Sequence, residues 1–479
     1  MSESQPNSQA QAQASLTQGN YRWYVLAVIF VGTFMGPLDS SIVNIALPVI
    51  AKEFGVGITT IEWVVMAYLL TTSSLLLSVG RIGDMIGHKR VYIFGFIAFT
   101  AASALCGFAG SIEQLIGFRA LQAIGATSLF ASAPAIITDV FPPHERGKAL
   151  GTIGTSVAIG LTAGPFLGGL IIGALDWRWI FFINIPIGII VVMLALAIIR
   201  ESRAETGKRF DILGAATGFG ALFSILLSLS MGNTWGWGSV LTIGLFLTSA
   251  VFATLFIRTE RRVSDPMLDL ALFHNRLFAA ANISALINYI ALFVVLILIP
   301  FYLFDIFKET PQRAGIVLMS VPLLMGIAAP ISGTISDKIG SRLLSSLGLG
   351  ITAVALYGLT WTSPETGVFL VAALLSLIGL GSGLFQAPNS NAIMGIVPRN
   401  RLGIAAAMQA TMRNVGMVLG VAMSGAIVAT IAPKGHTDPN LLSAIHTAFK
   451  AGAIMAALGV VTSLVRGSAT SVHRSGPVA

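Results

Sequence analysis

Residues 80–90 read Gly-Arg-Ile-Gly-Asp-Met-Ile-Gly-His-Lys-Arg, and residues 333–342 read Gly-Thr-Ile-Ser-Asp-Lys-Ile-Gly-Ser-Arg. Both stretches follow the pattern G-x-x-x-D-x-x-G, both end in basic residues, and about half of the chain separates them. Each comes directly after a long apolar segment. Such a repeat is typical of membrane folds that are built from two related halves. It therefore predicts a duplicated architecture with one copy of this loop in each half.

The composition requires that lipid covers most of the surface. Of the 479 residues, 55% are hydrophobic and only 10% are charged, and the mean hydropathy is +0.85. Soluble domains carry about 25% charged residues, so this chain has too few polar side chains to cover a water-exposed surface. Soluble enzymes, disordered regulators and nucleic-acid-binding modules are excluded, although the isoelectric point is near 9.8.

Apolar runs of spanning length, about 20 residues each, recur along the whole chain. Fourteen spans are predicted, at 22–48, 61–80, 91–110, 112–138, 148–173, 179–200, 212–232, 239–258, 275–303, 314–332, 343–361, 366–396, 403–431 and 443–465. The segments between them are too short to hold a folded soluble domain. The predicted fold class is an all-α polytopic membrane protein.

The basic residues predict the orientation of these spans. If the N-terminus is cytoplasmic, twenty of the 28 Lys and Arg residues fall on the cytoplasmic side, and Arg119 and Arg413 fall inside spans. The remaining six are Lys52, Arg178, Lys308, Arg313, Lys434 and Lys450. This bias follows the positive-inside rule, so the net charge of +8 is a topology signal. Both termini are predicted to be cytoplasmic, and no removable signal peptide is expected.

The repeat also predicts where the chain divides. Each loop follows the second helix of its half only if the seventh and eighth helices are an insert. The predicted parts are a disordered cytoplasmic tail at 1–21, a six-helix bundle at 22–200, a two-helix insert at 201–262, a second six-helix bundle at 263–465, and a cytoplasmic tail at 466–479.

The first span contains a carboxyl group, within residues 38–48, Leu-Asp-Ser-Ser-Ile-Val-Asn-Ile-Ala-Leu-Pro. An ionisable residue at membrane depth is costly and is a functional candidate by default. Burial would favour the protonated form, so Asp39 is a candidate for carrying a proton. The alternative is a structural Asp that caps a kink at Pro37 or pairs with an Arg. Arg119 lies at similar depth, so we predict that it lies near Asp39 and tunes its proton affinity, unless the pair is purely structural.

Other polar residues in the spans are candidates for coupling or for binding. Glu62 begins the second span and is either a second site for protons or a cationic substrate, or an acid favoured by the helix dipole. A central water-filled cavity would be lined by Asn44, Gln122, Asn288, Tyr289, Gln386, Asn389, Gln409 and Arg413. Asp305, at the end of the ninth span, is expected to be solvated or to alter substrate preference.

The fifth span carries Gly160, Gly164, Pro165 and Gly168. Small residues at intervals of three to four allow helices to pack closely. Spacing alone favours a packing face as the interpretation of this segment.

Together these motifs resemble the major facilitator superfamily, and in particular its fourteen-helix drug:proton antiporter branch, over nearly all of residues 22–465. The resemblance implies two six-helix bundles plus two extra helices, and it implies that the glycine-rich fifth helix marks an antiporter. It also implies that Asp84 meets a helix N-terminus of the opposite half and that Arg90 or Lys89 pairs with Asp139. The gating residues it implies are Gly80, Asp84, Gly87, Arg90, Asp139 and Asp337.

The function expected from this resemblance is proton-coupled efflux of amphipathic drugs by alternating access, in the cytoplasmic membrane of a bacterium. The proton gradient would be the energy source, with no cofactor, metal or nucleic-acid partner, and the protein would be a monomer. An exporter of one physiological solute or of a tetracycline-like drug is the alternative. A membrane enzyme is the remote alternative, because the sequence has no HExxH, GxSxG or P-loop motif. The single cysteine, Cys106, excludes a CxxC site.

Overall fold

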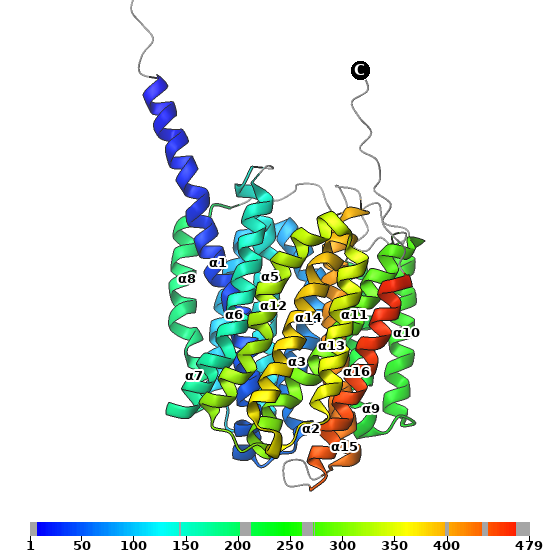
Figure 1. The fold of residues 1–479 in the computed structure, drawn as a ribbon. Coiled ribbons are helices and arrows are strands. Elements are labelled where there is room, and N and C mark those ends of the chain that lie inside the picture. The colour runs from blue at the N-terminus through cyan, green and yellow to red at the C-terminus, as the bar shows by residue number, and fades with distance from the viewer. Residues whose placement is uncertain are drawn as a thin grey trace, which may run out of the picture.

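The computed structural model is a bundle of long helices that run roughly parallel to one another (Figure 1). It describes residues 7–142, 145–201, 212–260, 272, 274–397, 402–433 and 439–465. Within these ranges fourteen helices are long and apolar enough to cross a membrane, as predicted, and no strand occurs. Helix α1 begins and α16 ends at one end of the bundle, here called the terminal end, and the opposite end is called the distal end.

The helices fall into a first half, an insert and a second half. The first half contains α1 (Asn7–Phe54), α2 (Ile58–Ile61), α3 (Trp63–Ile86), α4 (His88–Gly107), α5 (Ile112–Val140), α6 (Arg146–Ala174), α7 (Trp179–Phe182) and α8 (Asn184–Ile198). The insert contains α9 (Ile212–Trp235) and α10 (Val240–Glu260). The second half contains α11 (Arg276–Phe301), the π-helix η2 (Tyr302–Ile306), α12 (Pro311–Ile339), α13 (Ser341–Leu359), the 3-10 helix η3 (Pro364–Thr366), α14 (Val368–Gly395), α15 (Leu402–Ile431) and α16 (Leu441–Val465).

The structure departs from the predicted spans at their ends. The second span is divided at Glu62 into α2 and α3, and the sixth is divided at Ile183 into α7 and α8. Residues 7–21 form the first turns of α1, where a disordered tail was expected. The alanine and glutamine residues of this segment have high helix propensity. The predicted tail at 466–479 and most of the two linkers that flank the insert lie outside the described residues.

The internal repeat of the sequence is matched by a repeat in how the helices pack. Gly87 after α3 and Gly340 after α12 have φ angles of 99° and 85°, a conformation that favours glycine. In the first half α6 packs along α1 and α4 packs along α5, and in the second half α15 packs along α11 and α13 packs along α14. The two loops therefore end equivalent helices in two similarly packed halves.

The insert lies against both halves. Helix α9 packs on α3 of the first half and on α15 of the second, whereas α10 packs mainly on α9. On the other side of the molecule, α6 and α12 form the longest contact between the halves. The insert therefore covers one of the two lines along which the halves meet.

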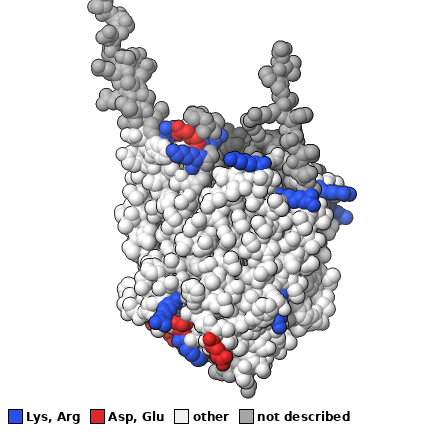
Figure 2. Space-filling model, in the orientation of Figure 1, with Lys and Arg blue, Asp and Glu red and all other residues white. Residues whose placement is uncertain are grey.

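The face of the molecule shown in Figure 2 is almost free of charge between the two ends. Lys and Arg gather at the terminal end together with some acidic residues, and a second mixed group of acids and bases lies at the distal end. Side chains without charge cover the space between them. Large side chains such as Phe94, Leu247 and Val354 are exposed on this belt. Such a belt is the surface that a lipid bilayer requires.

Candidate functional site

Asp39 lies at the centre of a buried polar cluster in the first half. Its carboxylate pairs with Arg119 of α5, with 2.5 Å between Oδ2 and Nη1. The side-chain amides of Gln122 and Asn184 donate to Oδ1 over 2.8 and 2.9 Å. Asp39 is 0% exposed and Arg119 is 1% exposed. The structure therefore brings Arg119 to Asp39, as predicted, and compensates the carboxylate charge completely.

Arg119 has further partners that do not depend on Asp39. Its Nε donates to the carbonyl of Val64 over 3.3 Å, and its guanidinium lies 4.3 Å from the ring centroid of Tyr68. Its Nη1 also donates to the side-chain oxygen of Gln122. A carbonyl, an amide and an aromatic face can all hold a cation. Arg119 can therefore stay in place when the charge of Asp39 changes.

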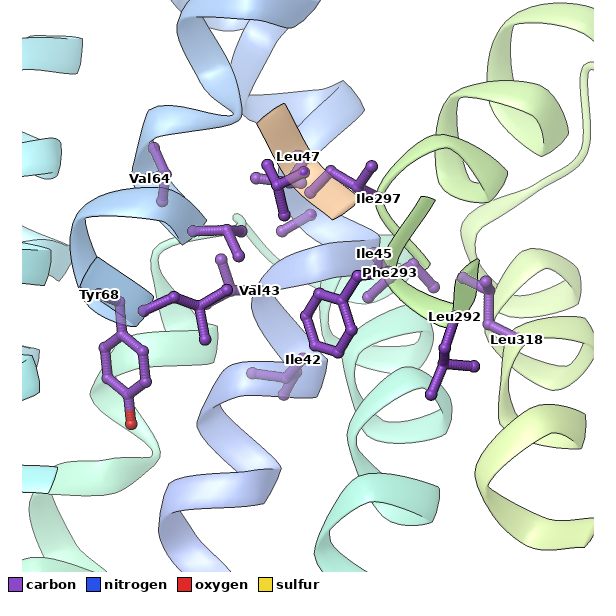
Figure 3. Close-up of a cluster of buried hydrophobic side chains, with 14 of the residues drawn as sticks. Ile42, Val43, Ile45, Leu47, Val64, Tyr68, Leu292, Phe293, Ile297 and Leu318 are labelled. Atoms are coloured by element: carbon purple, nitrogen blue, oxygen red, sulfur yellow. The ribbon is translucent and has the colours of Figure 1, made fainter. Parts of the chain in front are cut away.

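An apolar layer separates the Asp39 cluster from the distal end. Figure 3 shows side chains of α1 and α11 that face one another across the line between the halves. The layer is formed by Ile42, Ile45, Leu47, Leu292, Phe293 and Ile297, each at most 8% exposed. Ile42, Ile45 and Leu47 follow Asp39 along α1 toward the distal end, and the other three residues belong to α11. The layer therefore separates Asp39 from water at that end.

The halves are also tied together at the distal end itself. Lys52 at the end of α1 pairs with Asp305 of η2 over 3.0 Å. Asp305 is only 7% exposed, so the expectation that it is solvated is wrong. Nearby, a Cβ atom on Gly169 of α6 would overlap the carbonyl of Pro311, and one on Gly315 of α12 would overlap the carbonyl of Pro165. The backbones of the two halves therefore meet directly at this end.

The second half holds a different polar cluster. Arg413 of α15 lies beside the hydroxyl of Tyr289 of α11, which accepts a hydrogen bond of 2.5 Å from Gln386 of α14. One turn away, Gln409 of α15 donates to Ser390 of α14. Arg413, Gln386 and Gln409 are partly exposed, and in the described part of the chain no carboxylate pairs with Arg413. The structure therefore brings four predicted cavity residues together beside an uncompensated cation.

The other predicted cavity residues lie elsewhere. Gln122 is fully buried in the Asp39 cluster, so it does not face a cavity in this conformation. Asn389 donates to the carbonyl of Ala281 and thereby joins α14 to α11. The side-chain oxygens of Asn44 and Asn288 are buried, with no protein hydrogen-bond partner.

The loop after α3 forms contacts within the first half. Asp84 pairs with His88 over 3.2 Å and with Arg81 over 3.8 Å, and within the described ranges it has no partner in the opposite half. Arg90 pairs with Glu201 over 3.4 Å, and Lys89 donates to the carbonyl of Leu196. Among the residues that the structure describes, Arg90 therefore pairs with Glu201, which follows α8, and not with Asp139, which is exposed.

The remaining predicted gating residues are two glycines and Asp337. Gly80 has open space around its Cα, and a Cβ on Gly87 would overlap Glu201. Asp337 belongs to the last turns of α12, and its side chain lies outside the described part of the structure.

The glycines of α6 form the packing face that their spacing favours. A Cβ atom on Gly160 would lie 2.6 Å from the carbonyl oxygen of Phe34, and one on Gly168 would lie 2.6 Å from Ile45. A Cβ on Gly164 would overlap the hydroxyl of Ser41. All three positions hold α6 directly on α1, the helix that carries Asp39.

Some residues of the Asp39 cluster were not predicted. Asn184 is the first residue of α8, and its amide reaches Asp39. Ser103 of α4 accepts a hydrogen bond of 2.7 Å from Gln122. An asparagine within a strongly apolar run is the sequence signal for Asn184, since a buried amide needs a partner.

Comparison with known proteins places this arrangement in a family. The family model for the Major Facilitator Superfamily matches residues 29–211 and 281–477. The chain belongs to the Major Facilitator Superfamily. The gap between the two matched segments contains the α9–α10 insert.

Relatives within the superfamily are transporters and drug-resistance proteins. The chain is 36% identical over 403 residues to the riboflavin transporter RibZ of Clostridioides difficile, covering 84% of this chain and 87% of that one. It is 29% identical over 463 residues to the tetracenomycin C resistance and export protein of Streptomyces glaucescens, covering 94% and 86%. It is 32% identical over 409 residues to the multidrug transporter protein MdtP of Bacillus subtilis, covering 85% and 75%.

A solved structure agrees with the fold. A bacterial homolog of the human lysosomal transporter Spinster, in an inward-facing and unoccupied conformation, superimposes with a TM-score of 0.67 at 15% identity, covering 93% of this chain and 97% of that one. The duplicated helical architecture is therefore that of major facilitator transporters.

Proposed function

We propose that this protein exports small molecules by alternating access, in exchange for protons, and that Asp39 carries the proton. The observation that carries this proposal is the Asp39–Arg119 pair, buried at membrane depth and covered by an apolar layer on the distal side. Burying a charge pair in that position costs desolvation energy. Apolar residues could join the same helices without that cost, so the pair favours a functional role over a purely structural one. The multidrug and tetracenomycin-export relatives support export as the direction.

In the proposed cycle, the terminal end is cytoplasmic, in agreement with its Lys and Arg residues, and the structure represents a state that is closed at the distal end. Opening of the distal layer would admit water and a proton to Asp39. Neutral Asp39 would release Arg119 to Val64, Tyr68 and Gln122, which already contact it. Discharge of the proton toward the cytoplasm would restore the ion pair. Asp84 is proposed to contact the second half only when the terminal end closes.

Transport in proteoliposomes tests this proposal. Purified protein under an imposed pH gradient should accumulate fluorescent drugs, and Asp39→Asn should lose gradient-driven accumulation while retaining substrate binding. Full gradient-driven transport by Asp39→Asn would contradict the role of Asp39, and transport that ignores collapse of the gradient would contradict proton coupling. A cysteine at position 474 should be labelled from the cytoplasmic side, and labelling only from outside would contradict the orientation.

A transporter of one planar, carbonyl-rich solute is the second candidate, favoured by the cluster around Arg413. Arg413, Tyr289, Gln386 and Gln409 offer a cation, a hydroxyl and two amides on one side of the second half. A charged residue at this depth faces the bundle interior or water, so these groups are proposed to face substrate. Riboflavin is the substrate in the name of one relative. Equilibrium binding of riboflavin to the purified protein is therefore compared with the binding of a panel of cationic dyes. Tight binding of one compound with none of the panel would favour this candidate.

A further inference from the structure

A small cavity lies at the distal end where three parts of the chain meet. It offers about 20 Å³ of space to the centre of a water molecule. The first half contributes Thr59, Glu62, Trp63 and Met66, the insert contributes Ser230, and α15 of the second half contributes Gly425 and its neighbours. This cavity is separate from the Asp39 cluster and shares none of the side chains that bond to Asp39.

Two polar atoms of residues that line this cavity have no hydrogen-bond partner in the part of the chain that the structure describes. These are Oε1 of Glu62 and the hydroxyl of Ser230, and both are buried. Glu62 is only 2% exposed. A cavity of this size holds about one water molecule, and buried polar groups are hydrogen-bonded in nearly all proteins. One bound water that bridges Glu62 and Ser230 would therefore satisfy both groups.

The second oxygen of Glu62 is pressed against the opposite half. A Cβ atom on Gly425 would overlap Oε2 of Glu62, so the carboxyl fits only because position 425 is glycine. Helix α9 has no charged residue, and the charged residue of α15 in the described range is Arg413, three turns nearer the terminal end. Of the residues that line the cavity, Glu62 alone is titratable. Neighbouring charges on α1 are paired elsewhere, Lys52 with Asp305 and Glu53 with Arg178.

We propose that Glu62, Ser230, Gly425 and one bound water form a distal latch, which closes over a protonated Glu62 and thereby joins both halves to the insert. The proposal rests on the alternating-access function proposed above, and it gives the two extra helices a part in gating. In the closed latch the Glu62 hydroxyl donates to the water, and the water donates to Ser230. An ionised carboxylate without a partner is costly to bury, so loss of the proton favours separation of α15 from α3 and entry of water.

Distances across the distal end test the latch without measuring transport. Spin labels are attached in a Cys106→Ala background at Leu175→Cys and Glu365→Cys, which are exposed positions on the first and second halves. Double electron–electron resonance is recorded across a pH series. The wild-type latch should give a short distance at low pH and a longer distance at high pH. Glu62→Gln should give the short distance throughout, because the amide is neutral at every pH.

Ser230→Ala tests the contribution of the insert. Loss of one hydrogen bond should move the midpoint of closure to lower pH by roughly 0.5 to 1 pH unit. Ser228→Ala is the matched control, since Ser228 is also a serine of α9 and is buried, but its hydroxyl bonds to the carbonyl of Ile225 in its own helix. Gly425→Ala should give the longer distance throughout, and adding Glu62→Ala should restore the short one.

Three results would overturn the latch: a wild-type distance that does not respond to pH, a normal pH response in Glu62→Gln, or a shift in Ser230→Ala no larger than in Ser228→Ala. None of these would contradict a proton carried by Asp39, which is tested by transport in Asp39→Asn. Conversely, if Asp39→Asn showed that Asp39 does not carry the proton, the distances across the distal end would still change with the protonation of Glu62.

Discussion

The two halves share a fold, but the arginines inside their membrane spans have opposite surroundings. Arg119 in the first half is 1% exposed and pairs with a carboxylate that two amides also bond. Arg413 in the second half is partly exposed and contacts a hydroxyl whose other partner is an amide. The buried and compensated charges of Asp39 and Arg119 suit a proton-binding site. The uncompensated charge of Arg413, at the surface of its half, suits the binding of different ligands. This contrast supports the proposal that the two halves carry out separate tasks.

Removal of Arg119 should have the largest effect on this comparison. Arg119→Ala leaves Asp39 buried with no cation and should lower the free energy of unfolding by about 3–5 kcal/mol. The measurement is thermal unfolding in detergent, followed by tryptophan fluorescence. Adding Asp39→Asn should restore much of the loss, because the uncompensated charge is then gone. An Arg119→Ala protein as stable as the wild type would show that the pair is not held as tightly as the geometry indicates.

Close packing around Asp39 should give the next largest effect. Gly164→Ala forces a methyl group into the hydroxyl of Ser41 and should cost about 1–3 kcal/mol of stability through displacement of α6 from α1. Gly154→Ala on the same helix is the control, because no atom lies within 4 Å of the added group. Gly416→Ala in α15, where the methyl would meet the carbonyl of Leu286, should match Gly164→Ala if the halves are equally rigid. A clear difference between them would show that one half tolerates movement.

The sequence predicts the spans, the insert and the Asp39–Arg119 contact, because length, hydropathy and depth along a helix follow from residue order alone. It does not predict which of several partners a group selects in space. Arg90 was expected at Asp139 and contacts Glu201, since several acids lie at the same end and the helix ends decide between them. Ser230 lines the same cavity as Glu62 because α9 packs against both α3 and α15, and nothing in the sequence of α9 fixes that position.

Arg413→Gln should have a small effect on stability and a larger effect on binding. Because Arg413 is partly exposed and its removal leaves no buried carboxylate without a cation, the free energy of unfolding should change by less than about 1 kcal/mol. Affinity for an anionic or carbonyl-rich substrate should fall about tenfold, which corresponds to about 1.4 kcal/mol. Equilibrium binding of riboflavin and of a cationic dye distinguishes the effects, since the dye should bind at least as well. Equal loss for both compounds would indicate a structural role, like that of Arg119.

The ion pair between the halves should give the smallest effect. Lys52 has a side chain that is 55% exposed, whereas that of Asp305 is 3% exposed, so water screens one side of the contact. Such pairs contribute about 0.2–1 kcal/mol, and Lys52→Ala should therefore lower the population closed at the distal end by at most about fivefold. The rate of maleimide labelling at Ile297→Cys, in the Cys106→Ala background, reports that opening, because Ile297 lies in the apolar layer. Added salt should reduce the difference between Lys52→Ala and the wild type, since it screens the exposed cation. A difference that persists in high salt would mean that Lys52 acts through packing of its methylene chain and not through its charge.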